Sequence, residues 1–204
     1  MVLEQFDYQW FQTINHLGAV YTWLNPLMRF FAEDAEYLFF AGVIVYWFSR
    51  KASNRTMVGV ALLSACLAMG FGSVLGHFFY RDRPFVTHSV IQLIKHAGNA
   101  SFPSDHAMGA FAIAAAFWLY KPSTGKVWLT VAACIALSRV WTGVHYPLDV
   151  IAGAVIGAAT ALIVYQLVTR FVPLSRALNS IIAWYDRLEY KLWYKKKEKR
   201  SLNS

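Results

Sequence analysis

The chain has 204 residues, enough for one domain, of which 57% are hydrophobic and only 15% are charged. Because about a quarter of the residues in a typical soluble domain are charged, this composition excludes an ordinary soluble protein and predicts an integral membrane protein. The net charge is +8, and many of the basic residues lie between Lys191 and Arg200. Next to apolar segments, such a cluster is typical of a cytoplasmic anchor that faces anionic lipid, more than of a nucleic-acid surface.

Residues 1–34 begin with a predicted amphipathic helix and continue with a broken apolar stretch. Apolar side chains recur at helical spacing from Phe6 to Leu17, with polar residues between them, so this helix is suited to lie in the membrane interface. The following residues, 21–32, are interrupted by an Asn-Pro pair and an arginine, although the two pieces together are able to cross once. Two interpretations of residues 1–34 therefore stay open, an interfacial segment or a first span.

The predicted fold is all-α: a polytopic bundle of five to six transmembrane helices, with amphipathic interfacial helices at both ends, that forms a single domain over residues 1–204. Small residues recur along one of the spans and let membrane helices pack closely. A polar loop is predicted at 81–103, a tight turn at 143–147, and an amphipathic helix with a basic cytoplasmic tail at 174–204. The predicted later spans are 37–48, extended toward Ala32 to gain the necessary length, 56–80, 104–120, 126–142 and 148–172.

Basic residues in the short loops predict the orientation. Lysines and arginines flank the loops near residues 50–55 and 121–126 and fill the C-terminal tail, so these three parts are assigned to the cytoplasm. The loop 81–103 and the turn 143–147 then share the outer side, although the loop itself carries three basic residues. Both cysteines lie inside apolar runs, and a disulfide is not expected.

Three polar stretches meet at this outer face: Arg81 to Pro84, Ser101 to His106, and Ser138 to Asp149. Ionisable groups placed where a chain enters lipid are costly and indicate a functional site. Arg83 and Arg139 have planar, permanently charged side chains that suit phosphate oxygens. Ser104 is the predicted N-cap of a helix, whose free N–H groups and dipole form an anion site.

Two histidines accompany this predicted phosphate site. His106 stands in the first turn of its helix, facing whatever anion is held there. His145 precedes a second helix start, and Asp149 is placed to accept a hydrogen bond from one imidazole nitrogen, which leaves the other free to attack. One histidine as nucleophile and the other as proton donor match phosphoryl transfer through a phosphohistidine. Neither cysteines nor carboxylates cluster as in a metal site, so no metal or cofactor is expected.

The motifs Arg83-Pro84, Pro103-Ser104-x-His106 and Ser138-Arg139-x5-His145-x3-Asp149 resemble the three signature motifs of the type 2 phosphatidic acid phosphatase superfamily. The resemblance implies that His145 is the nucleophile and Asp149 its orienter. It implies that His106 protonates the leaving group, and that Arg83, Arg139 and Ser104 bind the phosphoryl oxygens.

The chain departs from the family pattern at two positions. The family has a lysine seven positions before the first arginine, where this chain has Gly76, and Arg81 is the candidate to reach the same phosphate instead. The family's glycine between serine and histidine is Asp105 here. Asp105 is predicted either to stabilise the helix N-terminus or to act with a pyrophosphate or a cation. His88 and His96, in the outer loop, are predicted to be solvated more than to contact substrate.

Within the superfamily, the small size, the Phe-Pro-Ser-Asp-His form and the basic tail resemble the bacitracin-resistance type of undecaprenyl pyrophosphate phosphatase. That resemblance implies hydrolysis of undecaprenyl pyrophosphate to undecaprenyl phosphate and inorganic phosphate at the extracytoplasmic face of the cell membrane, for recycling of the cell-wall carrier. The implied partners are the polyprenyl pyrophosphate and the bilayer, with no nucleic acid. Two alternatives stay open: a phosphatase for another lipid, such as phosphatidate or phosphatidylglycerol phosphate, and a non-catalytic lipid transporter or scramblase.

Overall fold

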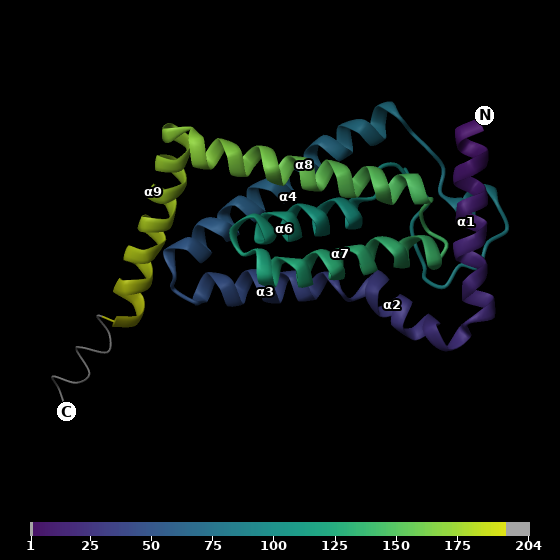
Figure 1. The fold of residues 1–204 in the computed structure, drawn as a ribbon, viewed down its shortest axis with the longest axis horizontal. Coiled ribbons are helices and arrows are strands. Elements are labelled where there is room, and N and C mark those ends of the chain that lie inside the picture. Colours follow the sequence, from purple (N-terminus) through teal and green to yellow (C-terminus); the bar gives the residue numbers. More distant parts are fainter. Residues whose placement is uncertain (1, 195–204) are drawn as a thin grey trace.

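The computed structural model describes residues 2–194 and is helical through most of that range (Figure 1), which confirms the all-α prediction. The predicted cytoplasmic tail, from residue 195 onward, lies outside the described residues. The elements are α1 (Val2–Val20), a 3-10 turn (Thr22–Leu24), α2 (Asn25–Glu33), α3 (Glu36–Phe48), α4 (Ala52–Phe78), α5 (Pro84–Thr87), α6 (Asp105–Tyr120), α7 (Pro122–Trp141), α8 (Pro147–Arg170), α9 (Val172–Glu189) and a π turn (Tyr190–Tyr194).

Two of the described helices, α4 and α8, are long and apolar enough to cross a membrane by themselves. Helix α3 is apolar but has only 13 residues, about 20 Å of helix against a hydrocarbon core of about 30 Å. It follows α2 after a two-residue break at Asp34 and Ala35. Large apolar side chains are exposed along these helices, for example Phe40, Phe71 and Val155. Such a surface suits lipid, not water.

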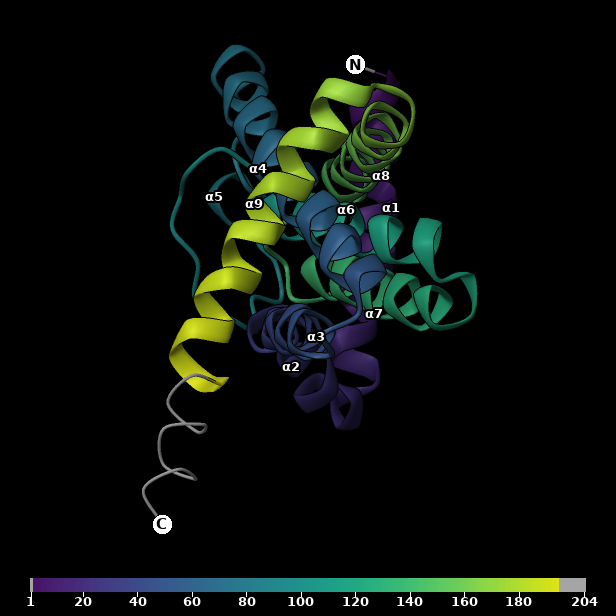
Figure 2. The ribbon, with the colours of Figure 1, turned by 90° about the vertical axis from the view of Figure 1, so that its left-hand side faces the viewer.

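Helix α6 is the centre of the bundle and packs against α4, α7 and α8 (Figure 2). Alanines fill much of it, and most of its residues are buried, so the neighbouring helices approach closely. Glycines of α8 allow the closest approach. A Cβ at Gly153 would lie 2.6 Å from the carbonyl oxygen of Ser104, and one at Gly157 would overlap the carbonyl oxygen of Met108. This packing holds the start of α8 against the start of α6.

The start of α7 corrects one prediction. A turn was expected over residues 121–125 and a helix from residue 126, but α7 begins at Pro122. Proline is favoured in the first helical turn, since its missing N–H has no partner there anyway. Gly125 then packs against the backbone of Trp118, where any Cβ would clash. The Ser-Thr-Gly sequence is therefore the first turn of a helix, not a loop.

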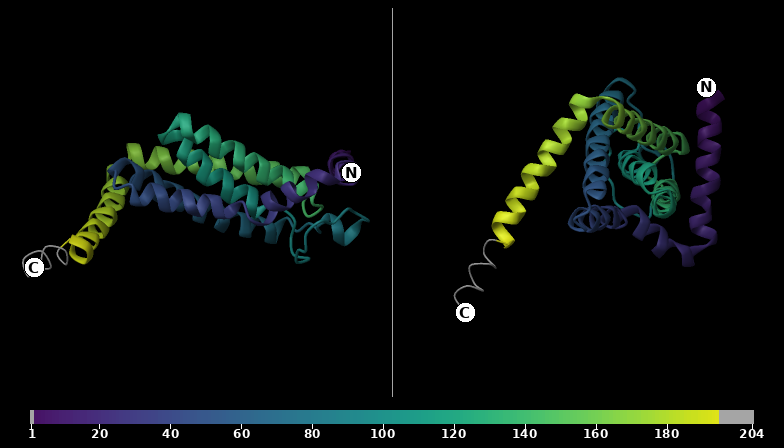
Figure 3. Two further views of the ribbon diagram at one scale, coloured as in Figure 1. Left: turned by 90° about the horizontal axis from the view of Figure 1, so that it is seen from below. Right: turned by 60° about the vertical axis from the view of Figure 1, so that its left-hand side comes forward.

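Helix α1 crosses one end of the bundle, nearly perpendicular to α7 and α8 (Figures 1 and 3). Asn15 fastens it: the side-chain amide donates to the carbonyl oxygens of Ile91 and Trp141, both at 2.8 Å, and accepts from the N–H of Ile91 at 2.9 Å. Helix α9 turns away at the opposite end (Figure 1), where Arg55 of α4 binds its Asp186 and Glu189. The two amphipathic helices thus mark the two ends of the bundle.

Candidate active site

The turn between α7 and α8 brings the residues of the longest motif together. Gly143 adopts a φ of +82°, a left-handed conformation that favours glycine. The chain reverses within the turn, and the N–H of His145 donates to the carbonyl oxygen of Arg139 at 3.2 Å. Arg139, in the last turn of α7, and Asp149, in the first turn of α8, therefore flank the His145 imidazole.

His145 is buried and held from both ring nitrogens. Nδ1 lies 3.4 Å from the Ser101 hydroxyl and 3.6 Å from Oδ2 of Asp149, while Nε2 lies 2.8 Å from Nη1 of Arg83. Burial lowers the pKa of His145 to about 4, and the nearby arginines lower it further while Asp149 raises it. The imidazole is therefore neutral near pH 7. Since a guanidinium only donates hydrogen bonds, Nε2 is the acceptor and the proton sits on Nδ1.

Asp149 is fixed by four neighbours. Its Oδ2 accepts from the Ser101 hydroxyl at 2.5 Å and from the N–H of Tyr146 at 2.9 Å. Its Oδ1 lies 3.1 Å from Nη1 of Arg81, and its carbonyl oxygen accepts from the N–H of Ser104 at 3.0 Å. The Ser101 hydroxyl thus stands between the carboxylate and Nδ1 of the imidazole, a link that the sequence alone did not single out.

Arg81 points toward carboxylates. The same Nη1 that meets Asp149 lies 2.6 Å from Oδ2 of Asp7, and the guanidinium sits 3.6 Å above the ring of Tyr146. The other oxygen of Asp7 accepts from the N–H of Leu148 at 2.9 Å. Asp7 is 2% exposed and was not among the predicted site residues. The sequence held a weak signal, since Asp7 lies one helical turn before Phe11 and two turns before Asn15, on the face of α1 that is buried.

Arg139 and Ser104 carry buried polar atoms without partners. Arg139 donates from Nη1 to the carbonyl oxygen of Ala32 at 2.6 Å, but its Nε and Nη2 are buried and have no hydrogen-bond partner in the described part of the chain. The Ser104 hydroxyl is likewise buried and has no hydrogen-bond partner among the described residues. Ser104 does occupy the N-cap position of α6, yet its side chain makes no capping hydrogen bond. Buried donors left unpaired are costly, and an anion would satisfy these.

Arg83 is anchored beside this set. Its Nε donates to Oδ1 of Asn99 at 3.0 Å, Nη2 to the carbonyl oxygen of Ala100 at 3.1 Å, and Nη1 to that of Val144 at 3.0 Å. The outer loop therefore sets the direction in which the guanidinium faces His145. Arg83 and Arg139 interact electrostatically with each other, and the positive end of the α6 dipole at Ser104 adds to an environment that favours an anion.

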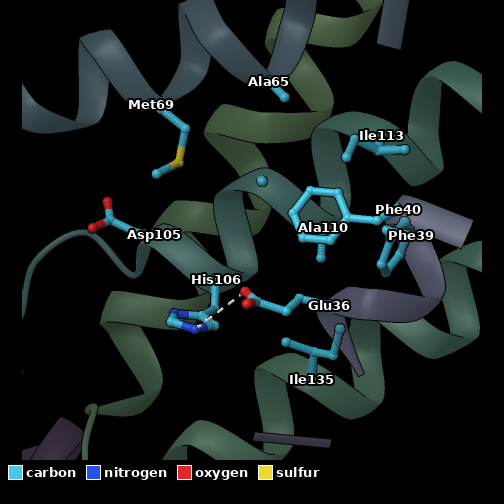
Figure 4. Close-up of a pocket in the computed structure, with 11 residues that line it drawn as sticks. Glu36, Phe39, Phe40, Ala65, Met69, Asp105, His106, Ala110, Ile113 and Ile135 are labelled. Atoms are coloured by element: carbon cyan, nitrogen blue, oxygen red, sulfur yellow. Dashed lines mark ion pairs between the residues drawn. The ribbon is translucent and has the colours of Figure 1, made fainter. Parts of the chain in front are cut away.

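His106, one residue into α6, opens onto a pocket of about 250 Å³ between α3, α4, α6 and α7 (Figure 4). Its Nε2 lies 3.7 Å from Oε2 of Glu36, the first residue of α3. The imidazole also interacts electrostatically with Arg139, Arg83 and His145, so both predicted catalytic histidines belong to one site. The remaining walls are almost entirely apolar: Phe39, Phe40, Ala65, Met69, Gly109, Ala110, Ile113 and Ile135, with Asp105 at the rim.

The outer-loop histidines correct a second prediction, since neither is merely solvated. The ring centroid of His96 lies 6.2 Å from that of His145, and burial lowers the pKa of His96. His88 stacks on Tyr8 of α1 at 4.1 Å between ring centroids. His96 is thus a further titratable group next to the site, while His88 belongs to the contact between the loop and α1.

Gly76 and Asp105, the two departures from the family pattern, lie along one polar pocket of about 440 Å³. A Cβ at Gly76 would meet the carbonyl oxygen of Phe102 at 3.0 Å, so this backbone is close to the loop that precedes α6. Asp105 is exposed and lines both this pocket and the apolar one. It therefore separates the two cavities at the start of α6.

Comparison with known protein families identifies the same superfamily that the sequence motifs resemble. The profile of the PAP2 superfamily matches residues 57–173, more than half of the chain. The match begins inside α4, so α1, α2 and α3, with Asp7 and Glu36, lie outside it. All three sequence motifs fall within it.

Relatives cover nearly the whole chain. The bacitracin transport permease protein BcrC of Bacillus licheniformis is 36% identical over 94% of this chain and 93% of its own length. The undecaprenyl-diphosphatase BcrC of Bacillus subtilis is 30% identical over 91% of this chain and 95% of its own length. The crystal structure of LpxE from Aquifex aeolicus superposes with a TM-score of 0.65 at 28% identity, covering 78% of this chain and 94% of that one.

Proposed function

The chain belongs to the PAP2 superfamily, and we propose that it hydrolyses undecaprenyl pyrophosphate to undecaprenyl phosphate and inorganic phosphate, supporting carrier recycling and bacitracin resistance. It is a membrane protein, and a lipid phosphate is the substrate class that its family implies. The observation that carries the proposal is a set of buried donors on Arg139 and Ser104, beside a neutral His145, that have no hydrogen-bond partner among residues 2–194. The names of the Bacillus relatives support the choice of lipid.

The proposed reaction has two steps. In the first, Nε2 of His145 attacks the terminal phosphorus, a nitrogen–phosphorus bond forms, and the bond from phosphorus to the bridging oxygen breaks. His106 gives its proton to that oxygen, and undecaprenyl phosphate leaves. Arg139, Arg83 and Ser104 hold the phosphoryl oxygens, on which charge is spread as the bond breaks. Asp149, through Ser101, keeps the proton of His145 on Nδ1.

In the second step, water attacks the phosphohistidine. His106, now neutral, takes one proton from the water, the nitrogen–phosphorus bond breaks, and inorganic phosphate leaves. His145 returns to its neutral form and His106 to its protonated form. Arg81 and Asp105 are assigned to the surroundings of this site: Arg81 behind Asp149, and Asp105 at the rim where a diphosphate enters.

A lipid substrate fits the surroundings of His106. The apolar pocket opens beside the imidazole, so a phosphate held by Arg139 has its lipid chain directed between α3 and α4. The head group then stays at the polar end of the bundle, at the outer face of the membrane, while the chain stays among apolar side chains.

Phosphate release from polyprenyl pyrophosphate by the purified protein, measured beside phosphatidate and phosphatidylglycerol phosphate, tests the substrate. We expect polyprenyl pyrophosphate to have the highest kcat/KM. A clear preference for another lipid would contradict the proposed substrate. His145→Ala is expected to abolish turnover while the melting temperature in detergent stays close to that of the wild type. Turnover that survives in this variant would exclude the phosphohistidine route.

The alternative of a lipid transporter has one specific support, because the Bacillus licheniformis relative carries the name of a transport permease. Quenching in alkaline detergent, after the protein is mixed with polyprenyl pyrophosphate labelled in its terminal phosphate, distinguishes the two. A phosphatase yields an acid-labile, base-stable phosphorylated protein that is missing in His145→Ala. A transporter yields no covalent product and no inorganic phosphate.

A further inference from the structure

Glu36 stands beside the predicted proton donor but outside the part of the chain that the superfamily profile matches. It is the first residue of α3, and its Oε2 lies 3.7 Å from Nε2 of His106 (Figure 4). An acidic residue at a helix N-terminus stabilises the helix dipole, which is the structural explanation of Glu36. That explanation does not account for its direction, toward the imidazole and along a pocket whose other walls are mostly apolar.

The other neighbours of His106 oppose its protonation. Arg139 of α7 and Arg83 of the outer loop both interact with it as cations. Nearby positive charge disfavours an imidazolium. A general acid, however, has to carry its proton before the leaving group departs. From the start of α3, Glu36 faces the ring with negative charge.

We propose that Glu36 is a positioning residue that keeps His106 in its imidazolium form, with Nε2–H directed at the carboxylate and Nδ1–H at the leaving-group oxygen. This inference rests on the proposed function. When the phosphorus–oxygen bond breaks, the proton on Nδ1 passes to that oxygen, and His106 stays neutral with Nε2–H still directed at Glu36. In the hydrolytic step Nδ1 takes a proton from water. Glu36 remains ionised throughout.

The proposal predicts that Glu36 matters more as the leaving group becomes more basic. Phenyl phosphate and p-nitrophenyl phosphate have nearly the same size, but phenolate needs protonation to leave far more than p-nitrophenolate does. Glu36→Gln is therefore expected to lower kcat for phenyl phosphate by about 10²-fold and for p-nitrophenyl phosphate by less than about threefold. With polyprenyl pyrophosphate, the alkaline limb of the kcat profile is expected to move to lower pH.

Glu33→Gln is the matched control. Glu33 ends α2, three residues before Glu36, and it too interacts electrostatically with Arg139. Its exchange removes the same charge from the same region, and we expect both aryl phosphates to be affected equally and weakly. Equal losses for the two substrates in Glu36→Gln, or an alkaline limb that does not move, would overturn the proposal. Failure of the proposed function itself would look different: the wild type would release no phosphate from polyprenyl pyrophosphate, whatever the ratio of the two aryl phosphates in Glu36→Gln.

Discussion

At the scale of single residues, the decisive feature is the direction of the hydrogen bonds around His145. Arg83 donates to Nε2 at 2.8 Å, so the nitrogen that would attack phosphorus is unprotonated and already faces a cation. In the proposed reaction, an incoming phosphoryl group replaces this imidazole as the acceptor of the Arg83 N–H. The site is thus prepared for an anion in the place where the nucleophile points.

The pH dependence of the reaction should report this burial. Because burial lowers the pKa of His145 to about 4, the imidazole stays neutral as pH falls to about 5 and becomes protonated only below that. An ordinary histidine would be protonated below about pH 6.5. We expect kcat/KM, corrected for the ionisation of the substrate phosphate, to keep its value down to about pH 5. A loss centred near pH 6.5 would contradict a buried neutral nucleophile.

Arg139 is the second residue for which the geometry predicts how much a substitution lowers kcat. Arg139→Lys keeps the charge but removes the planar set of donors, of which Nε and Nη2 are buried and without a partner among the residues that the structure describes. Loss of a single donor to a developing charge costs about 10²- to 10³-fold in rate, so we expect kcat to fall by about 100-fold. Arg29→Lys, at an exposed position of α2, is the control and should retain the wild-type kcat.

At the scale of the elements, α1 and α8 each have a specific task in holding the site. Helix α1 brings Asp7 to Arg81, and Arg81 to Asp149, so a helix outside the matched family region supports the pair of His145 and Asp149. Helix α8 lies so close to α6 that glycine is required at two contacts. Both arrangements depend on helix packing, not on residues that touch the substrate.

The link through α1 can be measured with a double-mutant cycle of Asp7→Asn and Arg81→Gln. Each single change breaks a charge-assisted hydrogen bond, and we expect it to lower the free energy of unfolding by about 1–3 kcal/mol. The double variant should lose less than the sum, with a coupling of about 1–2 kcal/mol, measured by denaturation in detergent. Strictly additive losses would mean that the contact contributes nothing, and Gln9→Ala, on the exposed face of α1, is the neutral control.

Two glycine substitutions test the packing of α6 on α8. In Gly157→Ala the new methyl group overlaps the backbone of α6, and overpacking of this kind costs about 1–3 kcal/mol. Gly70→Ala has open space around the new methyl group, and its better helix propensity should stabilise by up to about 1 kcal/mol. Melting temperatures in detergent should therefore move in opposite directions. A shift of the same sign in both would contradict the close contact.

At the scale of the whole molecule, the two amphipathic helices suggest where the membrane lies. Helix α8 has 24 residues and is about 36 Å long, slightly more than the hydrocarbon core of about 30 Å. Helix α1 crosses one end of the bundle and α9 leaves from the other (Figure 3). We propose that α1 lies in the outer interface beside the active site and α9 in the cytoplasmic one, which favours the interfacial interpretation of residues 1–34 over a first span.

Cysteine labelling tests this orientation. Gln92→Cys places a thiol on the exposed part of the outer loop, and Ser123→Cys places one at the exposed start of α7, at the opposite end of the bundle. A membrane-impermeant maleimide should label the first in intact cells and the second only after permeabilisation. The reverse pattern would mean that the protein has the opposite orientation in the membrane, with the active site on the cytoplasmic side. The native cysteines, Cys66 and Cys134, lie in the helices α4 and α7. Labelling of the protein without an added cysteine therefore gives the background signal.

Residues that are close together in the sequence were enough to predict much of the fold and of the candidate site. The twelve residues from Ser138 to Asp149 are close in the chain, so one turn suffices to bring an arginine, a histidine and a carboxylate together, and the motif alone predicted their proximity. The superfamily resemblance drawn from these motifs is confirmed by the profile match. Composition and apolar runs likewise predicted a helical membrane protein, because the length and polarity of a helix are properties of its own residues.

Only the tertiary structure decided which distant side chains meet those motifs. Glu36 reaches His106, Asp7 reaches Arg81, and Ser101 stands between His145 and Asp149. These pairs are separated by at least 44 positions along the chain, and their meeting depends on how α1, α3 and the outer loop pack on α6 and α8. A sequence pattern repeats along one helix and carries no information about the angle at which two helices cross. The residues that support the proposed chemistry from outside the motifs therefore became visible only in three dimensions.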